Sequence, residues 1–167
     1  MRILFITASR LGDAVLSTGL LDYITREHPD AKITVACGML PATLFEALPG
    51  LEDVIILNKR SWNRHWLDLW KQVVGQQWDI VIDLRNSAVS RLIRADKRYI
   101  FGKHINPDLH KVEQNAAVMG LSSVPSPRLW FSDTQKERAA RLIPDGGHVL
   151  AVGPTANWIG KTWPAER

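Results

Sequence analysis

The chain has 167 residues, of which 46% are hydrophobic and 23% are charged, and its formal net charge is +4. This length is enough for a domain with a buried core, and this hydrophobic fraction excludes an intrinsically disordered chain. No apolar run approaches the roughly 20 residues of a membrane-spanning helix, and the opening "MRILFIT" lacks a signal-peptide cleavage site. Cys37 is the one cysteine, which excludes an internal disulfide and is typical of a buried side chain in a reducing compartment.

Short apolar runs alternate with segments of helical periodicity. The predicted strands are residues 2–7, 32–37, 53–57, 78–84 and 98–102. The predicted helices are residues 12–26, 41–48, 62–74, 87–94, 110–120 and 133–142. This alternation predicts an α/β, Rossmann-like fold, a parallel sheet with helices on both faces. Residues 148–167 are predicted to begin a new strand, loop and helix, so we expect a domain over 1–145 and the truncated start of a second over 146–167.

Three segments lie at the carboxyl ends of predicted strands. Arg10, Gly12 and Asp13 follow the first strand, the Cys37–Gly38 corner follows the second, and Arg85–Asn86–Ser87 follows the fourth. Because the carboxyl ends of parallel strands lie at one edge of the sheet, we expect these segments to converge there.

Positive charge is concentrated between residues 85 and 111. The basic residues of this stretch are Arg85, Arg91, Arg94, Lys97, Arg98, Lys103 and Lys111, with His104 and His110 beside them. A solvated face and an anion-binding surface both explain such a run, and the sequence leaves the choice open.

Four segments resemble the lipopolysaccharide heptosyltransferases, the glycosyltransferase family 9 enzymes of GT-B fold. They are "MRILFITASRLGDAVLSTGLL", "WDIVIDLRNSAVSRLI", "HKVEQN" and "VGPTANWIGKTWPAER". The resemblance implies that this chain is the amino-terminal, acceptor-binding portion. Its acceptor is then a lipid-linked anionic core oligosaccharide, and an ADP-sugar donor binds the carboxyl-terminal domain, which this chain largely lacks. It further implies inversion without a required metal or other cofactor, and a cytoplasmic location at the inner face of the inner membrane with peripheral membrane contact. We expect the chain alone to be inactive.

Asp13 has two interpretations. An inverting transfer needs a base that takes the proton of the acceptor hydroxyl, and a carboxylate at a strand-to-helix turn suits that role. Alternatively, Asp13 only stabilises the helix N-terminus. The resemblance favours the base. Gly12 would let a substrate approach the backbone closely, and Arg10 would hold an acceptor carboxylate or phosphate unless it is simply exposed.

The resemblance assigns the remaining candidates to the two substrates. Arg85, Asn86 and His110 are expected to contact the acceptor, although His110 could instead cap a helix, and Asp83 is expected to have a structural partner. The donor-binding residues implied by the resemblance are Thr155, Asn157, Lys161 and Thr162. Lys161 lies in a loop that opens a helix, which favours a diphosphate site without the glycine spacing of a Walker loop.

Three tryptophans, Trp62, Trp66 and Trp70, recur at helical spacing and predict either a core stripe or a wall for sugars or a membrane interface. The scattered histidines lack metal-ligand spacing, so we expect no metal. A non-catalytic Rossmann-like module that binds a nucleotide or a sugar is the alternative function. A nucleic-acid-binding domain is disfavoured, because no recognition motif for DNA or RNA is present.

Overall fold

A computed structural model describes residues 1–58, 64–143, 146–153 and 159–162. The contacts divide the chain into two compact units, Met1–Ser132 and Asp133–Arg167. Each unit is described by itself below. The domain boundary expected near residue 145 stays a prediction, and the contacts separate the chain at residues 132 and 133 instead.

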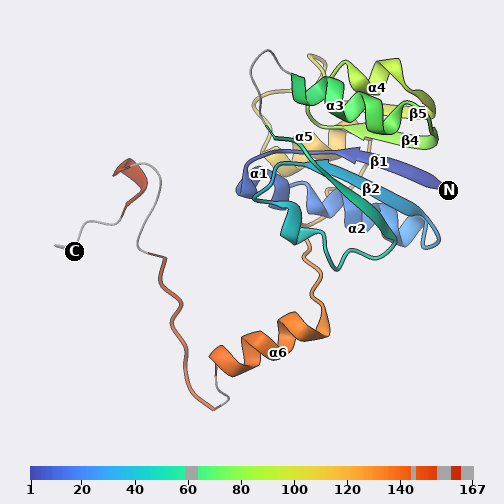
Figure 1. Ribbon diagram of the computed structural model, residues 1–167. Coiled ribbons are helices and arrows are strands. Elements are labelled where there is room, and N and C mark those ends of the chain that lie inside the picture. Colours follow the sequence, from blue (N-terminus) through green and yellow to red (C-terminus); the bar gives the residue numbers. More distant parts are fainter. Residues whose placement is uncertain (59–63, 144–145, 154–158, 163–167) are drawn as a thin grey trace. The chain divides into compact units, whose positions relative to one another are not determined.

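The first unit is built on a five-stranded parallel sheet with the strand order β3-β2-β1-β4-β5 (Figure 1). The strands are β1 (Arg2–Ile6), β2 (Lys32–Cys37), β3 (Leu51–Ile56), β4 (Gln77–Asp83) and β5 (Arg94–Ile100). All five predicted strands are confirmed, because short apolar runs bounded by turns can bury both faces of a strand. Strand β1 lies between β2 and β4, pairing Phe5 with Val35 on one side and with Ile82 on the other.

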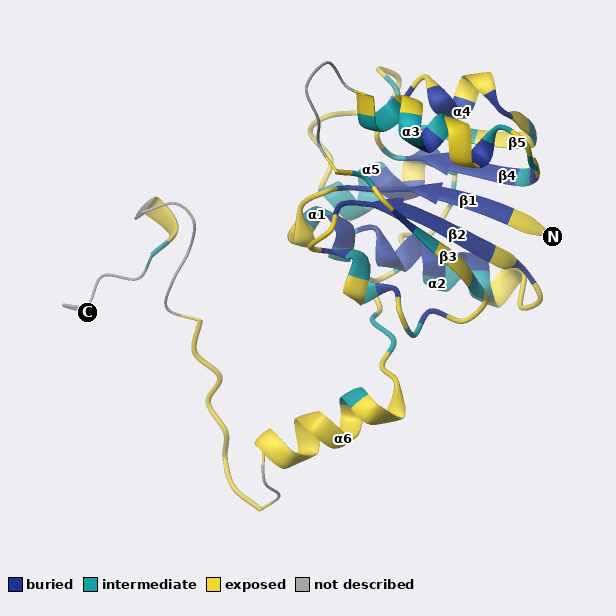
Figure 2. Cartoon of the chain, viewed as in Figure 1, coloured by how far each residue is buried: buried dark blue, intermediate teal, exposed yellow. Residues whose placement is uncertain are grey.

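Helices cover both faces of this sheet, as predicted (Figure 2). The helices of the first unit are α1 (Leu11–Val15), α2 (Thr18–Glu27), α3 (Arg64–Val73), α4 (Val89–Leu92) and α5 (Lys111–Val118), with a 3-10 turn η1 (Ala42–Leu44). Alternate strand residues divide the core into two clusters. Ile3 and Phe5 pack with Leu21 of α2 on one face, whereas Leu4 and Ile6 share the other cluster with Leu69 of α3. The α/β, Rossmann-like parallel-sheet class is therefore confirmed.

The single helix predicted over 12–26 is wrong, because the chain forms α1 and α2 with a break at Leu16 and Ser17. The Ser17 hydroxyl donates to the carbonyl of Ala14 at 2.7 Å, and the Thr18 hydroxyl donates to the carbonyl of Val15 at 2.7 Å. These side chains compete for carbonyls of the helical ladder. The Ser17 hydroxyl also lies 2.8 Å from that of Thr7, which ties the break to the end of β1.

The second unit contains the helix α6 (Asp133–Leu142), which was predicted, and a 3-10 turn η3 (Ile159–Lys161). The strand predicted from residue 148 is wrong, since residues 148–153 have no regular structure. A strand needs a neighbour for its backbone N–H and C=O groups. Within the described ranges, no segment pairs with residues 148–153, and Val149, Leu150 and Val152 are exposed.

Candidate active site at the carboxyl ends of β1 and β4

The chain connections reverse direction beside β1. The chain runs from β1 through β2 to β3 on one side, and then returns to place β4 on the other side of β1. Such a reversal opens a crevice outside the carboxyl ends of the two strands, and open α/β sheets bind their ligands there. The segments at this position are residues 7–13 after β1 and residues 84–87 after β4.

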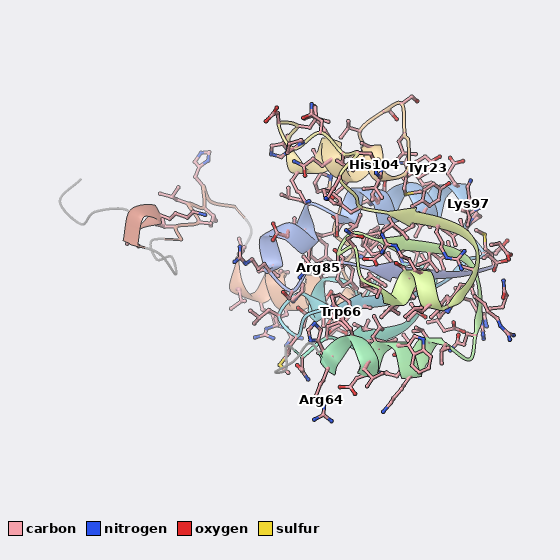
Figure 3. The ribbon with its side chains drawn as sticks, turned by 90° about the horizontal axis from the view of Figure 1, so that it is seen from above. Tyr23, Arg64, Trp66, Arg85, Lys97 and His104 are labelled. Carbon is pink, nitrogen blue, oxygen red and sulfur yellow. The ribbon has the colours of Figure 1, made fainter. Side chains whose placement is uncertain are left out.

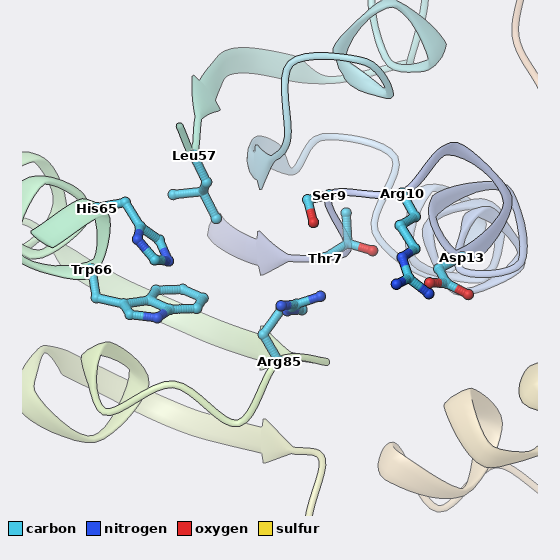
Figure 4. A pocket seen from close by; sticks show the side chains of 8 residues that line it. All are labelled: Thr7, Ser9, Arg10, Asp13, Leu57, His65, Trp66 and Arg85. Atoms are coloured by element: carbon cyan, nitrogen blue, oxygen red, sulfur yellow. The ribbon is translucent and has the colours of Figure 1, made fainter. Parts of the chain in front are cut away.

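A cavity of about 350 Å³ lies at this crevice, and it is called the large cavity below because it exceeds the neighbouring cavity that shares part of its wall. Its lining residues are Thr7, Ser9, Arg10, Asp13, Leu57, His65, Trp66 and Arg85. Figure 4 shows His65 and Trp66 on one side, Arg10 and Asp13 on the other, and Arg85 between them. The structure thus brings together three predicted site residues that lie up to 75 positions apart in the sequence, Arg10, Asp13 and Arg85.

Asp13 lies in the first turn of α1 and is partly exposed. Its carboxylate makes no hydrogen bond or salt bridge to any residue that the structure describes. Arg10 precedes the helix and is exposed, and its side chain makes no cap hydrogen bond. An accessible carboxylate without a protein donor can accept a proton from a ligand hydroxyl. This geometry leaves the helix-stabilising interpretation of Asp13 open, but it excludes a carboxylate buried in an ion pair.

Arg85 is presented by a turn that Asp83 holds. The buried Asp83 carboxylate accepts hydrogen bonds from the N–H of Arg85 at 2.8 Å, the N–H of Ser87 at 2.8 Å and the Ser87 hydroxyl at 2.7 Å. Asn86 takes the left-handed conformation, with φ +52°, and its side-chain oxygen accepts from Arg91 at 2.7 Å. Asp83 therefore has the structural partners that were expected.

The corner after β2 packs against the segment after β1. A Cβ atom on Gly38 would lie 2.6 Å from the Cα of Ser9, closer than real Cβ contacts, so glycine is required for this approach. Cys37 is buried, and burial raises the pKa of its thiol to about 12, which keeps it protonated and inert. The expected convergence of the three segments is confirmed, with the second acting as a support.

A second cavity, of about 230 Å³ and called the small cavity below, shares Thr7, Asp13 and Arg85 with the large one. Its other lining residues are Ala8, Leu84, Lys111 and Asn115. Burial lowers the pKa of the Lys111 ammonium, the nearby Asp13 carboxylate opposes that effect, and Arg85 adds to it. Asp13 and Arg85 therefore stand between two cavities rather than at the edge of one.

Other predicted acceptor residues lie outside the described cavity walls. Asn86 is exposed and bonded to Arg91. His110 caps α5: its Nδ1 accepts a long 3.5 Å bond from the N–H of Val112, while the Glu113 carboxylate accepts from the His110 N–H at 2.7 Å. A Cβ on Gly12 would meet nothing within 4 Å, so the space beside it is open. Acceptor contacts by these three residues stay predictions.

The basic stretch divides in the structure. Arg85 and Lys111 face the cavities, whereas the guanidinium of Arg98 donates to the carbonyls of Ser90, Ile93 and Ala95 and so secures the α4–β5 turn. Figure 3 shows Lys97 at the opposite side of the sheet from Arg85 and Trp66. Two residues of the stretch, Arg85 and Lys111, therefore line the cavities described above, and anion binding by them stays a prediction.

Of the predicted donor residues, Lys161 and Thr162 belong to the second unit, where Lys161 ends η3 and is exposed. Thr155 and Asn157 lie outside the described residues. The donor-binding assignments of these four residues stay predictions.

The described tryptophans of the stripe pack against the core, and a role of the stripe as a wall for sugars or a membrane interface stays a prediction. Trp62 lies outside the described residues. Trp70 packs against the core, and Trp66 packs there in part while lining the large cavity. His65, whose ring centroid lies 4.9 Å from that of Trp66, lines the same cavity and was missed by sequence reasoning. No sequence pattern indicated this position, because it depends on how α3 packs against the sheet.

In the described part of the chain, no helix is long and apolar enough to cross a membrane. The same residues contain no group of three or more His, Cys, Asp or Glu side chains placed to hold a metal ion.

Comparisons with solved structures identify the fold. Over 99% of its length, this chain aligns with Escherichia coli heptosyltransferase WaaC solved with ADP, at 19% identity and a TM-score of 0.69. It aligns over 99% of its length with a family 9 glycosyl transferase from Veillonella parvula, at 17% identity and a TM-score of 0.72. E. coli ADP-heptose LPS heptosyltransferase II matches 85% of the chain, at 19% identity and a TM-score of 0.58.

The fold is that of the heptosyltransferases. The resemblance seen in the sequence is thus confirmed at the level of the fold. The chain spans 62%, 57% and 50% of the lengths of these three structures. No protein-family model matches the chain. No curated protein matches it either.

Proposed function

We propose that this chain is the acceptor-binding half of an inverting glycosyltransferase. The donor is an ADP-sugar, heptose or a related sugar, and the acceptor is the lipid-linked anionic inner core of lipopolysaccharide. The observation that carries the proposal is the accessible Asp13 carboxylate, which lines a cavity together with Arg10 and Arg85 at the reversal point of the sheet. The likeness in fold to heptosyltransferases, one of them solved with ADP, supports it.

In this proposal Asp13 is the general base. A hydroxyl of the acceptor sugar donates a hydrogen bond to the Asp13 carboxylate and transfers its proton there as its oxygen attacks the anomeric carbon of the donor. The new C–O bond forms on the face opposite the ADP. The bond from the anomeric carbon to the ADP oxygen breaks, ADP leaves with the electron pair, and the configuration inverts.

The cations around Asp13 position the acceptor. Arg10 and Arg85 can each form two parallel hydrogen bonds with a carboxylate or phosphate of the core sugar. Trp66 offers an apolar ring face to a sugar in the large cavity. Thr155, Asn157, Lys161 and Thr162 are assigned to the donor's phosphates. In this proposal the enzyme acts at the cytoplasmic face of the inner membrane. It uses the ADP-sugar as a substrate and needs no cofactor.

The test uses the protein in which this chain is joined to a donor-binding half. We expect Asp13→Asn to lower kcat by about 10²–10⁴-fold, the usual contribution of general base catalysis, while acceptor affinity stays within about threefold. Asp30→Asn, on the exposed turn after α2, is the matched control and should leave kcat unchanged.

Two outcomes would refute the proposal. A wild-type protein that binds the core sugar but transfers nothing from any ADP-sugar is the non-catalytic binding module. An Asp13→Asn variant with wild-type turnover would remove Asp13 from the chemistry and leave the cavity without a base.

A further inference from the structure

One residue that lines the small cavity has a buried hydrogen-bond acceptor that lacks a donor. Asn115 on α5 is only 1% exposed, yet it lines this cavity beside Asp13 and Arg85. Its amide Nδ2 donates to the carbonyl of Leu16 at 3.1 Å. Its Oδ1 has no hydrogen-bond partner among the described residues. Buried polar atoms are nearly always paired, so this oxygen requires an explanation.

Rotation of the amide would not satisfy the oxygen. Exchanging Oδ1 and Nδ2 would place the oxygen against the Leu16 carbonyl, two acceptors face to face, and would lose the bond that links α5 to the α1–α2 break. Helix α5 is itself held at its start by the reciprocal His110 and Glu113 bonds. The unpaired Oδ1 is therefore a fixed feature of a residue that lines the small cavity.

Lys111 lies one helical turn before Asn115, so the two side chains share a face of α5. The Lys111 Nζ lies 4.2 Å from the centroid of the Phe101 ring and 3.4 Å from the side-chain oxygen of Gln114. These contacts hold the ammonium beside the cavity that Asn115 lines. The cavity wall thus offers one donor with a positive charge and one neutral acceptor.

Only some chemical groups complement this pair. A carboxylate could accept from Lys111 but could not donate to Asn115. A ligand cation could donate to Asn115 but would be repelled by Lys111 and Arg85. A hydroxyl both donates and accepts, so it can bridge the Asn115 oxygen and the Lys111 ammonium.

We propose that Asn115 and Lys111 select the acceptor by a second hydroxyl of the sugar that reacts at Asp13. This hydroxyl donates to Asn115 Oδ1 and accepts from Lys111 Nζ, while the attacking hydroxyl faces Asp13. The inference rests on the proposed function, and it makes the substrate a sugar diol whose two hydroxyls enter adjoining cavities. Asn115 acts on specificity and orientation and takes no proton.

The test measures binding to this 167-residue chain by calorimetry. The probes are a deacylated lipopolysaccharide inner-core oligosaccharide and a series of its monodeoxy analogues. We expect two analogues to bind about tenfold more weakly than the parent, the loss typical of one hydrogen bond. Asp13→Ala should abolish discrimination against one of them, and Asn115→Ala should abolish discrimination against the other.

The contact between the second hydroxyl and Lys111 can be tested with a substitution of Lys111. Lys111→Met should weaken binding of the parent oligosaccharide. It should leave nearly unchanged the binding of the analogue whose discrimination depends on Asn115, because that analogue lacks the bridging hydroxyl. Lys103→Met, an exposed lysine in the same basic stretch, is the matched control and should change neither affinity. These variants cover the case in which Asn115→Ala does not fold.

The outcomes separate the two proposals. If the wild-type chain binds the parent and discriminates against no analogue except the one tied to Asp13, a water molecule satisfies Asn115 and the further inference is overturned. The proposed function stands in that case. If the wild-type chain does not bind the parent at all, the acceptor assignment fails and the further inference fails with it.

Discussion

The charged side chains at the two ends of the sheet differ in whether they form salt bridges. At the amino ends of the strands, Arg2 and Glu52 also line a cavity, but Glu52 lies within 3.7 Å of both Arg2 and Lys32, so the charges there are paired with one another. At the carboxyl ends, Asp13 and Arg85 open onto two cavities. In the part of the chain that the structure describes, neither of them forms a salt bridge with another side chain.

This difference distinguishes charges that serve the fold from charges that serve a ligand. Exposed ion pairs contribute little stability, and those at the amino ends need no explanation beyond solubility. Charged side chains that line a cavity without forming salt bridges are available to a ligand. Departures from the usual pairing of charges are found mainly at functional sites. The carboxyl edge is therefore where substitutions should affect binding more than stability.

Strand β4 connects the two ends of the sheet, and substitutions at its two ends should give the largest difference in stability. Trp78, near its amino end, is fully buried, and its Nε1 donates to the Val73 carbonyl at 3.1 Å. We expect Trp78→Ala to lower the free energy of unfolding by about 3–5 kcal/mol, because a large cavity remains in the core. Arg85→Met, just past the carboxyl end, should change it by about 0.5 kcal/mol or less.

Urea denaturation followed by circular dichroism measures both variants, and calorimetry with the inner-core oligosaccharide measures affinity. Arg85→Met should bind at least tenfold more weakly, the loss typical of a hydrogen bond to a charged group. An Arg85→Met chain as unstable as Trp78→Ala would show that the carboxyl edge is structural, and the comparison would break.

The sequence predicts most of this sheet because its strands are short apolar runs between turns. It fails where structure depends on distant partners. The break between α1 and α2 needs the contact between Ser17 and Thr7, which periodicity within 12–26 does not reveal. The strand expected from residue 148 needs a neighbour to pair with, and an apolar run alone supplies none.

The candidate site was predictable in part for the same reason. Arg10, Asp13 and Arg85 directly follow strands, so chain order places them at one edge of the sheet. Asn115 and His65 reach the site from helices, and their convergence depends on how those helices pack. The sequence does contain a sign of Asn115, because this polar residue lies on the same predicted helix face as the apolar Val112 and Met119.

Two glycines at the carboxyl edge sharpen the comparison with a smaller effect. We expect Gly38→Ala to lower the free energy of unfolding by about 1–3 kcal/mol, because its Cβ would press on the backbone of Ser9.

Gly12→Ala, which meets open space in α1, should raise the free energy of unfolding by about 0.5 kcal/mol through its helix propensity. If substrate uses the space beside Gly12, the same variant binds the inner-core oligosaccharide more weakly. Wild-type affinity would remove Gly12 from the site.

The smallest expected effect concerns Lys111 and its pH dependence. Because burial lowers the pKa of this ammonium below its ordinary value of 10.5, the unfolded chain binds more protons between the folded pKa and 10.5. The stability of the wild type relative to Lys111→Met should therefore rise with pH across that window and be lowest below it. Urea midpoints of the two chains at pH 8 and pH 10.5 measure this difference. Lys103→Met is the control for the loss of an exposed ammonium.

A difference that stays constant or falls with pH would mean that the charge of Lys111 does not destabilise the fold, as for the paired charges at the amino ends. A rise would show that the fold keeps a destabilising charge beside Asp13, which a role in binding explains and a role in folding does not.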